Sequence, residues 1–254
     1  MSSPHLRGAG EVAEDDAGPA LAATYARLRE ALRVSFVPTV YRMLGVHEAY
    51  LGAATAAVAE LIASDSAEEF AVEARRRAHR AVSRMPAASI PLGAAKDAVE
   101  AIFERYNTAN PRNLLFARAL LPAGPTEPGG VMGPGQGSPP GSPDRELILA
   151  DVLESHGGFV QPGVWRELAE YPEFLAPAWQ AVRPLGGVPA FQEARVSIAR
   201  LASTVAAEVS PPDPRALRLG PEQVRSVETI LTWFSRGITA MIVEIEYLRE
   251  SGHA

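Results

Sequence analysis

The chain has 254 residues, a formal net charge of −6 at pH 7 and no cysteine. A chain of this length can bury enough surface to form a stable core without cross-links. The lack of cysteine excludes disulfides, thiolate zinc sites and CxxC redox chemistry, and the acidic balance argues against a general nucleic-acid binder.

Membrane and secretory signals are absent from the sequence. The first residues lack the basic-then-apolar pattern of a signal peptide. The most apolar stretch, residues 230–243, contains Arg236 and is too short to span a bilayer. We therefore expect a cytoplasmic protein whose partners include neither nucleic acid nor a membrane.

The first half of the chain has apolar residues at helical spacing. Residues 1–18 are polar and acidic and are predicted to be disordered. Residues 19–121 form the first helical repeat of the predicted plan. Within it we predict a helix from Pro19, two helices broken near Gly45, a charged helix over 67–83, and a helix over 94–107 followed by Asn110-Pro111 and further helix to Leu121.

A Pro/Gly-rich segment, residues 122–143, divides the chain and is predicted to be a flexible linker. Residues 144–250 form the second helical repeat. Its predicted helices cover 144–154, two segments of 163–183 broken at Tyr171-Pro172, 190–208 and 221–249. No segment alternates polar and apolar residues over a strand's length, so the fold class is all-α.

The two halves share a segment. Residues 36–61 and 160–185 align without a gap, and 9 of the 26 positions are identical. Arg42 falls on Arg166 in this alignment, and Pro38 falls on Pro162. The repeat predicts a helical pseudo-dimer, in which two internal repeats pack about an approximate two-fold axis. A functional site is then expected between the halves.

Familiar cofactor motifs are missing. The five histidines are scattered, no two have i, i+4 spacing, and HExxH is absent, so we predict no metal site. The glycines of residues 124–141 lie in a Pro-rich segment and not between a strand and a helix, which excludes a nucleotide-binding loop. We expect no cofactor.

Asn110 is the most informative polar residue, and its sequence context has two interpretations. Asn before Pro is a common helix start, with Asn as the N-cap and Pro111 at the first helical position. Alternatively, its amide lies in an apolar pocket and orients a water or an oxyanion. The two agree only if the side chain points away from its own helix.

Other candidates are less specific. His156 lies in a loop beside two glycines, where a histidine is usually exposed, but it is the nearest plausible general base in the second half. Phe36 and Tyr106 are each either a core residue or a pocket wall. Arg42 and Arg166 are a matched pair that either holds a carboxylate or forms structural ion pairs.

Three segments resemble the group I 2-haloacid dehalogenases, which act on both D and L enantiomers. They are LREALRVSFVPTVYRMLGVHEAYL (28–51), AIFERYNTANPRNLLFARAL (101–120) and WRELAEYPEFL (165–175). The resemblance implies an all-α pseudo-dimer within the alkylhydroperoxidase D-like helical group. It also implies a hydrolase in which an aspartate and an asparagine activate a water that attacks the substrate's Cα directly, with inversion.

The resemblance places the site residue by residue. The family asparagine matches Asn110, and a pocket aromatic matches Phe36, while a second pocket aromatic falls on Thr39. The family's Ser-Asp pair falls on Gly163 and Val164, so the catalytic aspartate is absent. Glu154, His156 and Glu167 are the nearby titratable candidates for the missing base. We expect Val164→Asp to raise halide release.

Three hypotheses follow from the sequence. The first is a 2-haloacid dehalogenase-like hydrolase, or a diverged relative, with Asn110 and His156 as catalytic residues and Phe36, Thr39, Gly163 and Val164 against the substrate. The second is a helical protein that binds a short carboxylic acid or an apolar ligand without catalysis. The third is a structural or interaction protein. A homodimer of the whole chain is compatible with each.

Overall fold

The structure, a computed structural model, describes residues 10–121 and 144–253. Every regular element within these two segments is a helix, and neither segment contains a strand. The all-α prediction is therefore confirmed for the described residues. None of their helices combines the length and apolar character that crossing a membrane requires. The predicted linker, residues 122–143, lies outside the described residues.

The first described segment contains five α-helices and short 3-10 turns. The helix bounds are α1 Pro19–Leu32, α2 Thr39–Leu44, α3 Glu48–Ala63, α4 Asp65–Val82 and α5 Lys96–Leu120, with 3-10 turns η2 Glu14–Asp16, η3 Gly45–His47 and η4 Gly93–Ala95. The turn η3 confirms the predicted break near Gly45.

The second described segment contains five more. The helix bounds are α6 Arg145–Ser155, α7 Gly163–Leu168, α8 Pro172–Val182, α9 Pro189–Val205 and α10 Pro221–His253, with a 3-10 turn η5 Arg183–Gly187. Pro172 begins α8, where its missing N–H has no intrahelical partner to lose. The predicted break at Tyr171-Pro172 is confirmed.

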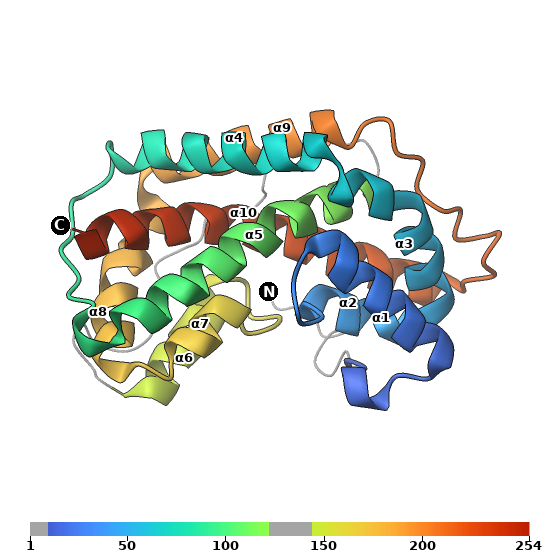
Figure 1. The fold of residues 1–254 in the computed structure, drawn as a ribbon, viewed down its shortest axis with the longest axis horizontal. Helices are drawn as coiled ribbons and strands as arrows, with labels where there is room; N and C mark the ends of the chain where they lie inside the picture. Colours follow the sequence, from blue (N-terminus) through green and yellow to red (C-terminus); the bar gives the residue numbers. More distant parts are fainter. Residues whose placement is uncertain (1–9, 122–143, 254) are drawn as a thin grey trace.

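Two long helices form the centre of the molecule. Helices α5 and α10 pack against each other, and α4 packs on α9 along one side (Figure 1). Helices α1 to α3 gather at one end of this assembly, and α6 to α8 gather at the other (Figure 1). Helix α10 also contacts α2 and α8, so the central helices connect both ends through a continuous apolar core.

Helix α5 differs from the prediction at its centre. It continues without a break from Lys96 to Leu120, with Pro111 inside it. The proline removes one helical N–H and cannot bond the carbonyl of Asn107. Residues on both sides of Pro111 are buried, so tertiary packing stabilises the continuous helix. The interpretation of Asn110 as the N-cap of a new helix is therefore wrong.

Residues 10–18 also differ from the prediction, which had them disordered. This segment crosses α1 and α2: Val12 N–H donates to the Arg42 carbonyl over 3.0 Å, and the Tyr25 hydroxyl donates to the Val12 carbonyl over 2.9 Å. Glu14 pairs with Arg29 and accepts a 2.8 Å hydrogen bond from Val37 N–H. These polar contacts hold residues 10–18 against α1 and α2, although the composition of the segment suggested disorder.

Candidate functional site

A cavity of about 160 Å³ lies among α2, α5, α7 and α10. This is smaller than the roughly 300–1,000 Å³ of pockets for drug-sized ligands, so its size suits a small molecule. The chain before α2, residues 36–38, and the chain before α7, residues 160–162, complete its wall. Segments from both halves of the sequence thus enclose one space.

Four of the six site residues singled out in the sequence line this cavity: Phe36, Thr39, Asn110 and Gly163. Phe36 lies beside Tyr106, with ring centroids 6.3 Å apart. The structure does not bring the other two to the cavity. Val164 and His156 are buried in the protein but are not part of the cavity wall.

Asn110 belongs to a polar stripe on α5. Tyr106, Asn110 and Asn113 are spaced by four and three residues, which places them on one face of the helix, and all three line the cavity. The side chain of Asn110 is buried, and its Nδ2 has no hydrogen-bond partner among the described residues. A buried donor without an acceptor costs about 1–3 kcal/mol, a cost that a hydrogen bond to this amide would remove.

Three further cavity residues carry buried N–H groups that have no acceptor within the described parts of the chain. They are Nε of Arg42, Nε2 of Gln161 and Nε1 of Trp233. Native structures satisfy nearly all such groups. Four residues that line the cavity therefore each carry one unsatisfied buried donor, a group that a carboxylate, a halide or an ordered water would satisfy.

Two arginines place positive charge at the cavity. Arg42 Nη2 donates to Thr39 Oγ1 over 3.2 Å and lies 3.4 Å from Glu11 Oε2. Arg166 is exposed, and no carboxylate within the described segments forms an ion pair with it. The repeat alignment matched these two residues, and both line the cavity.

Glu167 and Tyr106 form the acceptor side of the cavity. The Tyr106 hydroxyl donates to Glu167 Oε1 over 2.8 Å, and Arg105 pairs with the other carboxylate oxygen. Burial, followed by the charge of Glu167 and this hydrogen bond, raises the pKa of Tyr106 well above its ordinary value. The phenol therefore stays protonated and acts as a donor. Glu14, from the segment predicted to be disordered, is a second carboxylate on the wall.

Gly163 permits the close approach of α7 to α5. A Cβ at this position would overlap the hydroxyl of Tyr106. The residue is the first of α7, directly after Pro162. A glycine here thus lets the Tyr106 hydroxyl reach Glu167, one turn further along the same helix.

His156 belongs to a buried network behind the site. Its Nδ1 lies 2.8 Å from the Val152 carbonyl and its Nε2 lies 3.1 Å from Glu244 Oε1. Glu244 also accepts a 3.1 Å hydrogen bond from Trp165 Nε1. Both ring nitrogens face acceptors, so the arrangement suits an imidazolium that donates twice. Its contacts with protein groups occupy both nitrogens.

Sequence reasoning missed several residues of the wall. Tyr106 was left open as a core residue or a pocket wall, although it lies four residues before Asn110 on a predicted helix. Gln161 and Trp233 carry no local signal, because only the packing of α10 against the chain before α7 brings them together. Glu14 was not predicted, because the acidic composition of its segment indicated disorder.

The comparisons with known proteins agree with this fold. No protein-family model and no curated protein matches the chain. Solved structures do. A D-2-haloacid dehalogenase with L-LA has a TM-score of 0.77, 16% identity, and coverage of 96% of both chains. A mutant of such an enzyme has a TM-score of 0.76 and 16% identity, and a mutant in complex with D-2-CPA has 0.75 and 15%, each covering 96% of this chain and 95% of the other. At this identity the similarity shows that the chain has the all-helical fold of D-2-haloacid dehalogenases.

Proposed function

We propose that the chain is a 2-haloacid dehalogenase-like hydrolase, or a diverged relative, that displaces halide from a short 2-haloalkanoic acid by water. The observation that carries this proposal is that four residues lining one small cavity each have a buried donor without an acceptor among the described residues: Asn110 Nδ2, Gln161 Nε2, Trp233 Nε1 and Arg42 Nε. Donors of this kind suit both the carboxylate of such a substrate and the halide that leaves. The fold shared with D-2-haloacid dehalogenases supports the same reading.

We also propose that the fold is the pseudo-dimer predicted from the repeat. Helices α2 and α3 cover the first copy, and α7 and α8 cover the second. Helix α4 packs on α9 and α5 packs on α10, as expected where elements of equal rank in the two halves meet about an axis. Arg42 and Arg166, equivalent in the alignment, line one cavity.

The roles follow from chemistry and position. Arg42 and Arg166 hold the substrate carboxylate, since guanidinium groups match its geometry. Asn110 holds the attacking water. The water oxygen forms the new bond to Cα as the carbon–halogen bond breaks, and the halide leaves with the electron pair. Glu167 takes the proton, which replaces the sequence assignment of His156. Written this way, the reaction needs no cofactor.

Of the three candidates for the base named from the sequence, Glu167 suits the role best. Glu154 and His156 are not part of the cavity wall, whereas Glu167 is. A carboxylate has about four lone-pair positions. Tyr106 and Arg105 therefore leave Glu167 able to accept from a water. The Tyr106 hydroxyl fixes its position relative to Asn110, one helical turn away on α5.

The test is halide release from both enantiomers of 2-chloropropionate and 2-bromopropionate. Glu167→Gln keeps the shape of the side chain but removes its basicity, so the rate should fall about 10²–10⁴-fold. Glu170→Gln is the matched control, because Glu170 is exposed and lies outside the cavity. An unchanged rate in Glu167→Gln would contradict the assignment of the base.

A second candidate function is binding without catalysis. It is favoured by Val164, an apolar and buried residue where the resemblance places the catalytic aspartate. Binding to the folded state raises the melting temperature. Thermal stabilisation by 2-chloropropionate without halide release would support a binding protein, whereas halide release supports the hydrolase.

A further inference from the structure

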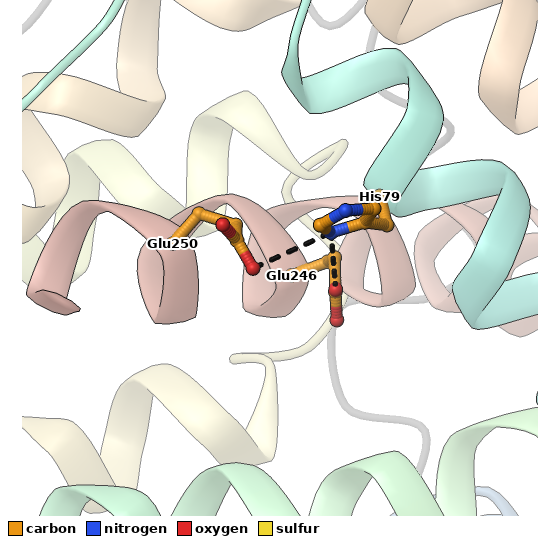
Figure 2. Close-up of side chains that lie close together, drawn as sticks. All are labelled: His79, Glu246 and Glu250. Carbon is orange, nitrogen blue, oxygen red and sulfur yellow. Dashed lines mark ion pairs between the residues drawn. The ribbon is translucent and has the colours of Figure 1, made fainter. Parts of the chain in front are cut away.

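We propose that His79, Glu246 and Glu250 form a zinc site that joins α4 to α10, away from the cavity. Figure 2 shows the imidazole of His79 reaching from α4 toward two carboxylates on α10. Histidine spacing along the sequence indicates only sites on one helix, whereas this group takes its ligands from two helices. Only the packing of α4 on α10 brings them together.

The geometry fits a tetrahedral ion. Nδ1 of His79 lies 3.3 Å from Glu246 Oε1 and 3.3 Å from Glu250 Oε1 (Figure 2). Zinc binds histidine nitrogen and carboxylate oxygen at about 2.0–2.1 Å, so neighbouring ligand atoms of a tetrahedral site lie about 3.3–3.4 Å apart. The three ligand atoms all lie within 4.8 Å of one another. Small side-chain rotations therefore complete three corners of a tetrahedron, and water supplies the fourth.

Glu246 gives a second and independent indication. Its side chain is 90 % buried, being only 10% exposed, and its Oε2 has no hydrogen-bond partner within the described segments. Arg249 Nη1 lies 3.6 Å from that oxygen. A buried carboxylate that lacks hydrogen bonds is costly. A metal ion bound through Glu246 Oε1 would neutralise part of the charge of this buried carboxylate, while Oε2 would keep Arg249 Nη1 as an outer contact.

The position on the helices also favours a cation. His79 lies in the last turn of α4, and Glu250 lies in the last turn of α10. Helix C-termini carry negative partial charge, which stabilises nearby cations. Two carboxylates balance the charge of a divalent ion. The ion would hold the ends of α4 and α10 together, and this role is structural.

The ligand types select the metal. One imidazole nitrogen and two carboxylate oxygens are ordinary zinc ligands. Mg²⁺ prefers an octahedral shell of oxygen and usually keeps several waters. We therefore assign Zn²⁺ to this site, with Mg²⁺ binding far more weakly.

The test is isothermal titration calorimetry of the untagged full chain with ZnCl₂ and with MgCl₂ at pH 7. We expect one zinc per chain at this site. His79→Ala and Glu250→Gln should each weaken zinc binding at least about tenfold, because loss of outer contacts alone costs about 10–100-fold. Both residues are largely exposed, so these variants should fold normally, and circular dichroism checks that they do. Zinc should also raise the melting temperature of the wild type and not of the variants.

Matched controls are His47→Gln and Glu228→Gln, a histidine and an exposed α10 glutamate outside the group. Both should keep wild-type zinc affinity. Zinc binding that is equal in His79→Ala and the wild type would overturn the proposal. So would Mg²⁺ binding as tight as Zn²⁺, or no zinc binding at all, in which case His79 simply pairs with the two carboxylates when it is protonated.

Discussion

The hydroxyl of Tyr106 lies 2.8 Å from Oε1 of Glu167. This hydrogen bond joins the middle of α5 to α7 across the cavity wall. It holds the proposed base, Glu167, beside Tyr106, which lies one helical turn before Asn110 on α5, and Gly163 leaves room for the phenol.

Gly163→Ala should disturb this relationship. The added methyl group would overlap the Tyr106 hydroxyl and displace it from Glu167. Overpacking of this kind costs about 1–3 kcal/mol of unfolding free energy. Misplacing a reacting group by about 1 Å can lower a rate about 10²-fold. Chemical denaturation and halide release measure the two effects.

Gly187→Ala is the control for this substitution, because a Cβ at Gly187 meets nothing within 4 Å. It should leave stability and halide release within about the ±0.5 kcal/mol range of neutral surface changes. Normal halide release in Gly163→Ala would show that the Tyr106–Glu167 contact does not position the base.

The buried pair of His156 and Glu244 should make stability depend on pH. Desolvation lowers the pKa of His156, but the charge of Glu244 and the hydrogen bonds to Glu244 and Val152 outweigh it, so the pKa is raised overall even against Arg195. Folded protein then binds more protons than unfolded protein above the ordinary histidine pKa of about 6.5. The stabilisation is complete below that pH and is lost as the pH rises through the folded pKa.

Denaturant unfolding between pH 5 and pH 9 measures this effect. The wild type should lose unfolding free energy toward alkaline pH, and His156→Gln should remove that slope. His47→Gln is the control, since burial lowers the pKa of His47 and its contribution has the opposite sign. An equal alkaline slope in His156→Gln would exclude His156 as its source.

Val164→Asp is expected to destabilise the protein, which reverses the prediction made from sequence. Val164 is 1% exposed and is not part of the cavity wall. An aspartate there would be a buried charge with no cation provided for it, and the effective penalty is several kcal/mol. Val164→Thr keeps the shape and adds one hydroxyl, so it should cost only about 1–3 kcal/mol. A fully stable Val164→Asp variant with raised halide release would instead support the prediction made from the sequence.

The helices were largely predictable because their signals are local. Apolar spacing and breaks at Gly45 and Pro172 marked α2, α3, α7 and α8 within a few residues. The Asn110-Pro111 pair led to a wrong prediction of a helix start. Helix α5 continues through Pro111, because burial along it outweighs the loss of one helical hydrogen bond. Residues 10–18 misled for a similar reason, since their contacts with Arg29 and Val37 are tertiary.

The site was predictable only in part. The resemblance and the repeat identified Phe36, Thr39, Asn110 and Gly163, which share a cavity. Donors from α10 and from the chain before α7 could not be found, because no local pattern reports which helix faces pack together. No sequence pattern therefore predicts that Trp233 and Gln161 line the cavity.

The most direct test of the account compares two buried asparagines on α5. Asn110 lines the cavity and Asn107 does not, and Nδ2 of each has no hydrogen-bond partner among the described residues. Halide release from 2-chloropropionate should be measured for the wild type, Asn110→Ala and Asn107→Ala. We predict that Asn110→Ala lowers the rate about 10²–10³-fold, while Asn107→Ala stays near the wild type. Equal rates for the two variants, or no halide release by the wild type, would contradict it.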